Sequence, residues 1–145
     1  MEKEYNLINS ILKFEGEYLY GKIWNGKGYN INGNYEFEIK NGKGNVKEYY
    51  NYNGKLIFEG EYLNGERNGK GKEYYNNGQL IFDREYLNGQ PNGKEKEYYH
   101  SGALKFEGEY LNGNIWNGKG YNINGNFEFE IKNGKGHIKE YYDNG

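Results

Sequence analysis

The residues of this chain that could do chemistry are mainly glutamates, lysines and two histidines. His100 and His137 stand 37 positions apart with neither Cys nor Asp beside them, so they do not resemble a metal site, which gathers several ligands. Ser10 and Ser101 are the only serines, and Thr and Cys are absent, which argues against a nucleophilic enzyme. Paired carboxylates could hydrolyse a glycosidic bond, but the glutamates recur at repeat positions facing lysines. The sequence therefore predicts neither an enzyme nor a cofactor site.

The composition excludes a conventional aliphatic core. The 145 residues include 18 Tyr, 7 Phe, 24 Gly and no Cys, so aromatic rings must pack the protein, and disulfide bonds are excluded. No apolar run approaches the roughly 18 residues of a transmembrane helix, and the first residues lack the features of a signal peptide. The formal net charge of −2 offers no attraction for nucleic acid or for an anionic membrane. We expect a cytoplasmic protein.

Internal repeats cover the whole chain. Six units begin near residues 14, 35, 58, 82, 106 and 127, after a half-unit at residues 1–13. Residues 14–50 recur as residues 106–142, and 32 of these 37 positions are identical. Because no linker separates the units, residues 1–145 are expected to form a single repeat array.

Within a unit, side chains alternate as they do along a β-strand. Phe58, Gly60 and Tyr62 share one face. Glu59 and Glu61 share the other face, as expected for a period of two. Asn-Gly, the strongest short signal for a tight hairpin, occurs 14 times and brackets these strands. Each unit is therefore predicted to be a β-hairpin, with glycines leaving room for the aromatic rings above them.

The spacing of the turns predicts how the strands pair. If Tyr62 faces Gly69, then Gly60 faces Gly71, and each glutamate of one strand faces a lysine of the next. The pairs predicted in this way are Glu59–Lys72, Glu61–Lys70, Glu85–Lys94, Glu17–Lys27 and Glu109–Lys119. Opposite charges that face each other across strands stabilise a sheet modestly.

One unit departs from the pattern at two positions together. Arg84 and Glu95 replace the two glycines that face each other in the preceding unit, so we expect their side chains to lie side by side on one face. Two interpretations remain open, a polar recognition spot for a partner or a structural pair whose charges compensate each other.

The recurring residues resemble the MORN repeat. The unit that begins at Phe58 reads Phe-Glu-Gly-Glu-Tyr-x-Asn-Gly, a short turn, Asn-Gly-Lys-Gly and then Glu-Tyr-Tyr, and it is especially similar to the bacterial MORN variant of small antitoxin-like proteins. The resemblance implies an all-β fold, an elongated single-layer twisted antiparallel sheet of stacked β-hairpins. It also implies a non-catalytic scaffold that binds partners. Phe37 and Phe129 depart from the motif, which has Gly there, so the register of residues 35–57 and 127–145 stays open.

Two groups of residues are candidates for binding a partner. Ile23–Trp24 and Ile115–Trp116 replace polar residues near the predicted hairpin tips, where they are either interface anchors or caps over the ends of the array. The Tyr-Tyr pairs should place one ring on each side of the sheet. This predicts an exposed row of rings suited to a protein partner, which comprises Tyr50, Tyr75, Tyr99 and Tyr142.

These features favour a non-catalytic protein-binding module. The resemblance to antitoxin-like proteins implies a stoichiometric inhibitor of a toxin or nuclease. Attachment to a membrane is an alternative, although the chain offers no basic patch or amphipathic helix for it. Direct binding of nucleic acid is not expected at this net charge. Self-assembly is also open, through a homodimer of the terminal units.

Overall fold

Tight turns set the shape of each repeat. Asn64 and Gly65 join two strands with positive φ angles of 54° and 73°, the backbone of a type I′ turn, which matches the right-handed twist of a hairpin. Asn88 and Gly89 repeat this conformation, with φ angles of 51° and 79°. Strands joined in this way pair antiparallel with their neighbour in the chain.

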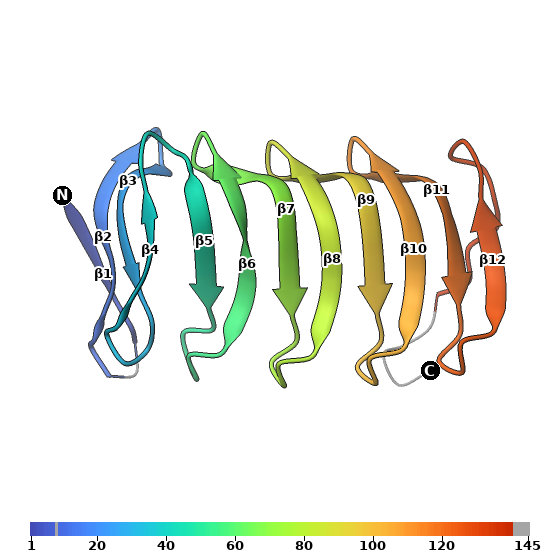
Figure 1. The fold of residues 1–145 in the computed structure, drawn as a ribbon, viewed down its shortest axis with the longest axis horizontal. Helices are drawn as coiled ribbons and strands as arrows, with labels where there is room; N and C mark the ends of the chain where they lie inside the picture. The colour runs from blue at the N-terminus through green and yellow to red at the C-terminus, as the bar shows by residue number, and fades with distance from the viewer. Residues whose placement is uncertain (8, 141–145) are drawn as a thin grey trace.

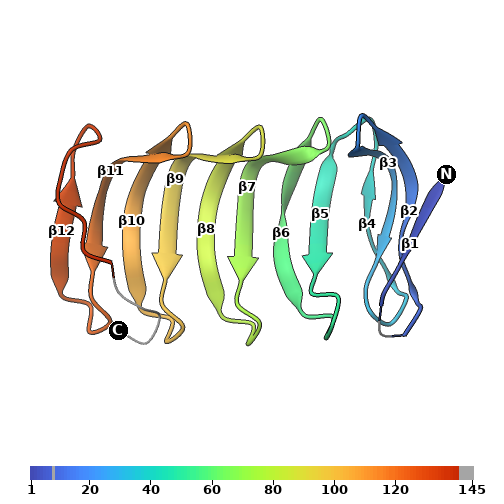
Figure 2. The ribbon, with the colours of Figure 1, turned by 180° about the vertical axis from the view of Figure 1, so that it is seen from behind.

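The computed structural model describes residues 1–7 and 9–140, which form twelve strands and no helix. The strands are β1 (Glu2–Tyr5), β2 (Leu12–Leu19), β3 (Lys22–Tyr29), β4 (Tyr35–Ile39), β5 (Gly44–Tyr49), β6 (Leu56–Leu63), β7 (Glu66–Tyr74), β8 (Leu80–Leu87), β9 (Gln90–Tyr98), β10 (Leu104–Leu111), β11 (Asn114–Tyr121) and β12 (Phe127–Ile131). They stand side by side along the long axis of the molecule (Figures 1 and 2). The predicted all-β array of sequential antiparallel hairpins is confirmed.

The array is divided between two sheets. Strands β1–β4 form a four-stranded sheet and β5–β12 form an eight-stranded sheet, both in chain order. Between β4 and β5, an isolated bridge joins Lys40 and Lys43. The turn between these two lysines forms backbone hydrogen bonds to both sheets. The Gly42 amide donates to the Trp24 carbonyl at 2.7 Å, and the Gly42 carbonyl accepts from the Gly65 amide at 2.9 Å. Turn backbone therefore joins the two sheets.

The predicted register is confirmed in the middle of the array. Glu59 faces Lys72 and Gly60 faces Gly71 across β6 and β7. Beyond Gly60 a β-bulge shifts the pairing, so Tyr62 faces Arg67 and the prediction that it faces Gly69 is wrong. The predicted pairs Glu61–Lys70 and Glu85–Lys94 fall at this bulge and its equivalent in the next hairpin, and they are not observed as facing residues.

The register predicted for the first and fifth units is also wrong. Glu15, not Glu17, faces Lys27, and Glu107, not Glu109, faces Lys119. These hairpins contain one residue more than their neighbours, and the prediction placed it in the turn. The two-residue turn is retained, and the pairing beyond the β-bulge is shifted by two residues, so Gly16 faces Gly26 whereas the equivalent Gly60 faces Gly71.

The core is a row of aromatic rings lying on glycines. The Phe58 side chain is fully buried, and a Cβ atom on Gly71 would lie 2.6 Å from its ring. The Phe37 ring covers Gly28 in the same way, which explains why Phe can stand at that position of the motif. The buried apolar side chains are Phe14, Ile39, Val46, Phe58, Tyr86, Tyr99, Phe106 and Ile131.

Candidate functional site

One face of the large sheet carries a row of charges whose sign changes at every strand. Each charged residue faces the next across a pair of neighbouring strands. From β5 to β12 the row consists of Lys47, Glu59, Lys72, Asp83, Lys96, Glu107, Lys119 and Glu130. Because neighbouring strands lie about 4.8 Å apart, like charges recur about every 10 Å. We call this set the charged row.

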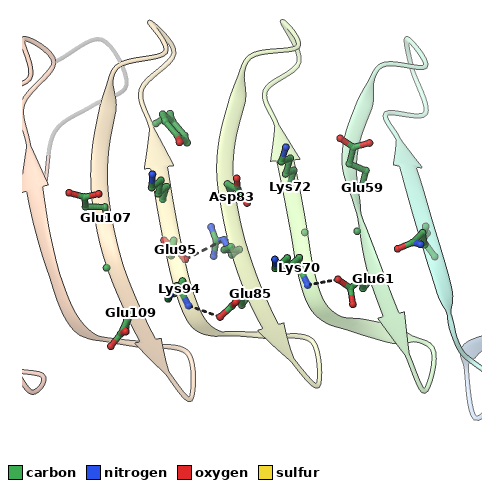
Figure 3. Close-up of a pocket in the computed structure, with 18 of the residues that line it drawn as sticks. Glu59, Glu61, Lys70, Lys72, Asp83, Glu85, Lys94, Glu95, Glu107 and Glu109 are labelled. Atoms are coloured by element: carbon green, nitrogen blue, oxygen red, sulfur yellow. Dashed lines mark hydrogen bonds and ion pairs between the residues drawn. The ribbon is translucent and has the colours of Figure 1, made fainter.

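A second, shorter row runs beside the charged row. Lys70 faces Glu85 across β7 and β8, and Lys94 faces Glu109 across β9 and β10. Within a hairpin the β-bulge changes the contact, so the Glu85 carboxylate accepts a hydrogen bond from the backbone amide of Lys94 at 2.9 Å. Both rows line an open pocket that crosses the sheet from β5 to β11 (Figure 3).

Four lysines of this pocket differ from Lys47, which also lines it and is paired with Glu36 at 2.7 Å. Lys70, Lys72, Lys94 and Lys96 are exposed, and none of their ammonium groups lies within 4.0 Å of a carboxylate in the part of the chain that the structure describes. Charges that alternate in sign produce no extended positive field, so the pocket does not suit a nucleic-acid backbone. It suits a partner surface with a matching pattern of charge.

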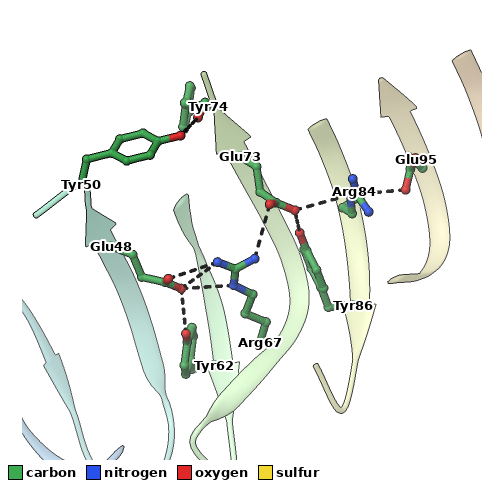
Figure 4. Close-up of polar contacts among 9 residues, drawn as sticks. All are labelled: Glu48, Tyr50, Tyr62, Arg67, Glu73, Tyr74, Arg84, Tyr86 and Glu95. Carbon is green, nitrogen blue, oxygen red and sulfur yellow. Dashed lines mark hydrogen bonds and ion pairs between the residues drawn. The ribbon is translucent and has the colours of Figure 1, made fainter. Parts of the chain in front are cut away.

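The opposite face holds a network of ionised side chains among the aromatic rings (Figure 4). The Arg67 guanidinium contacts Glu48 at 3.1 Å and Glu73 at 3.5 Å, and it lies 3.9 Å above the centre of the Phe58 ring. Tyr62 donates a hydrogen bond to Glu48 at 2.8 Å. Cross-strand carboxylates and guanidinium groups therefore stabilise this face beside the rings.

The expected contact of Arg84 with Glu95 extends this network. The two residues face each other across β8 and β9, and Arg84 Nε lies 3.3 Å from a Glu95 carboxylate oxygen. Their side chains are only 9 % and 1 % exposed. Burial raises the pKa of Glu95 to about 7, against the opposing effect of Arg84. Because both groups are buried, they favour the structural interpretation over a recognition spot.

The comparisons with known proteins identify the repeat. Residues 58–80 match the MORN repeat family. This segment spans β6, β7 and the start of β8, so the match covers one repeat of the array. No curated protein matches the chain.

MORN repeats are generally non-catalytic and imply a binding scaffold. Among the residues that the structure describes, no three His, Cys, Asp or Glu side chains gather in a way that could hold a metal ion. The same residues contain no helix that is long and apolar enough to span a membrane.

The tryptophans of the array do not lie at the hairpin tips. The β2–β3 turn consists of Tyr20 and Gly21, whereas Trp24 lies within β3 and is half-buried. Trp116 lies within β11 and is 40 % exposed. The prediction of tip positions is wrong because the turns keep two residues and strand pairing begins directly beyond them, at Leu19 with Lys22 and at Leu111 with Asn114. The neighbouring Ile23 and Ile115 are also half-buried strand residues.

The second tyrosines of the Tyr-Tyr pairs connect successive repeat units. The hydroxyl groups of Tyr50, Tyr75 and Tyr99 donate to backbone carbonyls in the following unit, at 3.4, 3.3 and 2.9 Å. Tyr50 and Tyr75 are half-buried, and Tyr99 is fully buried. The prediction that Tyr99 lines an exposed surface is therefore wrong. Tyr142 lies outside the described residues.

This role predicts a measurable loss when one hydroxyl is removed. Tyr99→Phe is expected to lower the free energy of unfolding by about 1 kcal/mol, because the hydroxyl of this fully buried side chain no longer donates to the Tyr121 carbonyl. Urea unfolding followed by tyrosine fluorescence measures this change. Tyr50→Phe is the matched control, and its effect should be smaller because its hydrogen bond is longer and its side chain is only half-buried. Equal losses in the two variants would contradict the assignment.

Sequence reasoning missed two features of the site. It paired charges within hairpins but not between them, so the continuity of the charged row was not anticipated. The signal was available, because Lys70 and Glu85 are as regularly spaced as the pairs within a hairpin. It also missed that Arg67 joins Glu48 to Glu73, since Glu48 lies on β5, two strands away from Arg67 and Glu73 on β7.

Proposed function

We propose that this chain is a non-catalytic scaffold that binds a partner protein stoichiometrically through the charged row. The alternation of Lys and carboxylate side chains at a fixed spacing supports the proposal, and five of the eight side chains are exposed: Lys72, Asp83, Lys96, Lys119 and Glu130. A rigid pattern of charge discriminates among partners and sets their register, because a partner displaced by one strand would meet like charges.

Binding along this pocket would act by occlusion. The resemblance to antitoxin-like MORN proteins supports an enzyme as the partner, a toxin or a nuclease whose own surface carries acidic and basic groups in the complementary order. Such an inhibitor needs no catalytic group of its own. The absence of cysteine from the whole sequence fits action in a reducing cytoplasm.

Reversing two charges of the row tests the proposal. A tagged chain is used to capture its partner from a cell lysate, with crosslinking, and the captured protein is then titrated with purified variants. Lys72→Glu combined with Lys96→Glu is expected to weaken binding at least about tenfold, because each change brings a like charge against the partner. The loss should shrink as salt is added.

Lys40→Glu combined with Lys55→Glu is the matched control. It makes the same change in net charge at exposed lysines outside the pocket and should leave the affinity unchanged. Equal weakening by the two double variants would contradict the charged row as the binding surface. Failure of the chain to retain any protein would contradict the scaffold proposal itself.

A further inference from the structure

The joint between the two sheets shows how one part of this chain packs on the next. Gly42 has no room for a side chain, because a Cβ there would lie 2.8 Å from the Trp24 ring and 2.9 Å from the Asn64 Cα. Its carbonyl accepts the hydrogen bond from Gly65 at 2.9 Å. Next to it, β5 pairs with β6, and this pairing buries Val46 to 2 % exposure. The joint thus has two parts. The turn that contains Gly42 packs against the Asn64–Gly65 turn, and β5 pairs with β6.

The first half of this joint recurs 92 positions later. The Gly134 amide donates to the Trp116 carbonyl at 2.7 Å, as Gly42 does to Trp24. Near Gly134, however, a Cβ would meet only the Trp116 ring, at 3.4 Å. The described residues therefore place no second turn on this surface, and Trp116 is left 40 % exposed.

Residues 136–140 lie where a strand equivalent to β5 would begin. Lys139 pairs with Glu128 at 3.2 Å, which repeats the contact of Lys47 with Glu36 at 2.7 Å. The segment nevertheless forms no strand, since no equivalent of β6 lies beside it among the described residues. Ile138, which stands at the position of Val46, is consequently 47 % exposed.

The second half of the joint recurs at the other end of the molecule. Strand β1 pairs with β2 in the register in which β5 pairs with β6, so Glu2 faces Gly16 as Val46 faces Gly60. The loops before β2 and β6 contain the same hydrogen bond. The Ile11 amide donates to the Asn9 side chain at 3.1 Å, and the Lys55 amide donates to the Asn53 side chain at 3.0 Å. The Tyr20–Gly21 turn stands at the position of the Asn64–Gly65 turn.

We propose that this chain associates head-to-tail with a second copy through these two surfaces. Residues 136–140 of one copy pair with β2 of the other, and the Tyr20–Gly21 turn lies on Gly134 and Trp116. The pairing displaces β1, whose four residues are all exposed. Ile138 then occupies the position held by Glu2, so an apolar residue replaces a carboxylate where the joint buries Val46. The two surfaces differ, so the contact is heterologous and can propagate.

Tyr20 is an independent sign of a contact at this turn. Its φ angle is 52°, and the other non-glycine residues with positive φ in the described chain are Ser10 and five asparagines. An aromatic residue in this conformation is uncommon and strained, and the Tyr20 side chain is 95 % exposed. In the proposed contact the ring packs against Trp116, which accounts for an aromatic residue at a turn position that otherwise favours Asn.

The charges of the two surfaces are compatible. Lys139 takes the place of Lys3 opposite Glu15, so the alternation of sign across the strands continues. Lys22 meets Asn114, which stands where the internal joint has a lysine paired with Glu66. No like charges are brought together at either position.

Sedimentation of the 145-residue chain over a range of concentrations tests the inference. The average mass is expected to rise with concentration beyond that of a dimer. Ile138→Glu, which introduces the residue type found at Glu2, should leave the chain monomeric. Tyr20→Asn should weaken association at least about tenfold. Circular dichroism checks that both variants keep the sheet.

Leu87→Glu is the matched control, since it puts the same charge at a 48 % exposed leucine in the middle of the array. It should associate as the parent chain does. A parent chain that stays monomeric at the highest concentration would overturn the inference, and so would equal loss of association in Ile138→Glu and Leu87→Glu. The charged row takes no part in this contact, so the result does not depend on the proposed function.

Directed crosslinking gives the orientation. The chain contains no cysteine, so one copy carrying Tyr20→Cys and another carrying Asn133→Cys should form a mixed disulfide on oxidation. Asn88→Cys, at the equivalent turn position in mid-array, replaces Tyr20→Cys in the control. Crosslinking that is equally efficient with the control would contradict the head-to-tail arrangement.

Discussion

Replacing Gly71 by alanine is expected to lower the free energy of unfolding by about 3 kcal/mol, at the upper end of the usual cost of overpacking a core. A Cβ at this position would lie 2.6 Å from the Phe58 ring and 3.0 Å from the Tyr86 ring. Both rings are buried, and the rows of rings on either side leave them no space to move. Urea unfolding, followed by tyrosine fluorescence and far-ultraviolet circular dichroism, measures the loss.

Two further variants separate crowding from backbone effects. Gly78→Ala adds a methyl group where no atom lies within 4 Å, at a backbone φ of +87°. The expected loss of about 1 kcal/mol in unfolding free energy therefore measures only the unfavourable backbone conformation of alanine at positive φ. Phe58→Leu shortens the ring that Gly71→Ala would strike. Combining Phe58→Leu with Gly71→Ala should therefore cost less than the sum of the single changes. Strict additivity would show that ring and glycine are not in contact.

The fold was accessible from the sequence because its causes are local. Alternation of Phe58, Gly60 and Tyr62 predicts a strand, and Asn-Gly predicts the turn that joins it to the next. The strand and the turn together predict that Glu59 faces Lys72, and this pairing is observed. A repeat applies the same local rules many times, so few alternatives remain for the whole.

Errors began where β-bulges interrupt the alternation. A register shift precedes Tyr74 in its pairing with β8, so the rule that neighbouring residues face opposite sides does not carry through the Tyr-Tyr pairs. This is why Tyr99 was expected on a surface and is buried. Trp24 was misplaced for a related reason, because turn length alone does not reveal whether an extra residue enters a turn or a bulge.

The site was predictable only in part. The pairing of Arg84 with Glu95 could be predicted because both replace glycines that face each other in the preceding unit. The two residues face each other across β8 and β9 as expected. The charged row needs the registers between hairpins as well, and those depend on the connecting turns and their bulges. The array of exposed lysines is thus a property of the assembled sheet.

The carboxyl group of Glu95 is expected to make the stability of the chain fall as pH rises from about 5 to 8. Its pKa is raised from 4.5 to about 7, mainly by burial, with Glu97 and Glu73 adding to the shift and Arg84 and Tyr110 opposing it. The folded protein therefore holds a proton at this site that the unfolded chain has already released. The stabilisation is fully present below pH 4.5 and is lost as pH rises through 7, with a limit of about 3 kcal/mol for such a shift.

Glu95→Gln isolates this contribution, because the amide has nearly the same shape and stays uncharged. The difference in unfolding free energy between the variant and the parent, measured in urea at pH 5 and pH 8, should move in favour of the variant at pH 8 by up to about 3 kcal/mol. Glu109→Gln, which removes an exposed carboxylate on the charged face, should show no such change. Glu36 acts in another window, because Lys47 lowers its pKa and its stabilisation is lost only below pH 4.5. A difference between parent and Glu95→Gln that stays constant from pH 5 to pH 8 would show that the buried carboxylate is ionised throughout and that Arg84 alone compensates its charge.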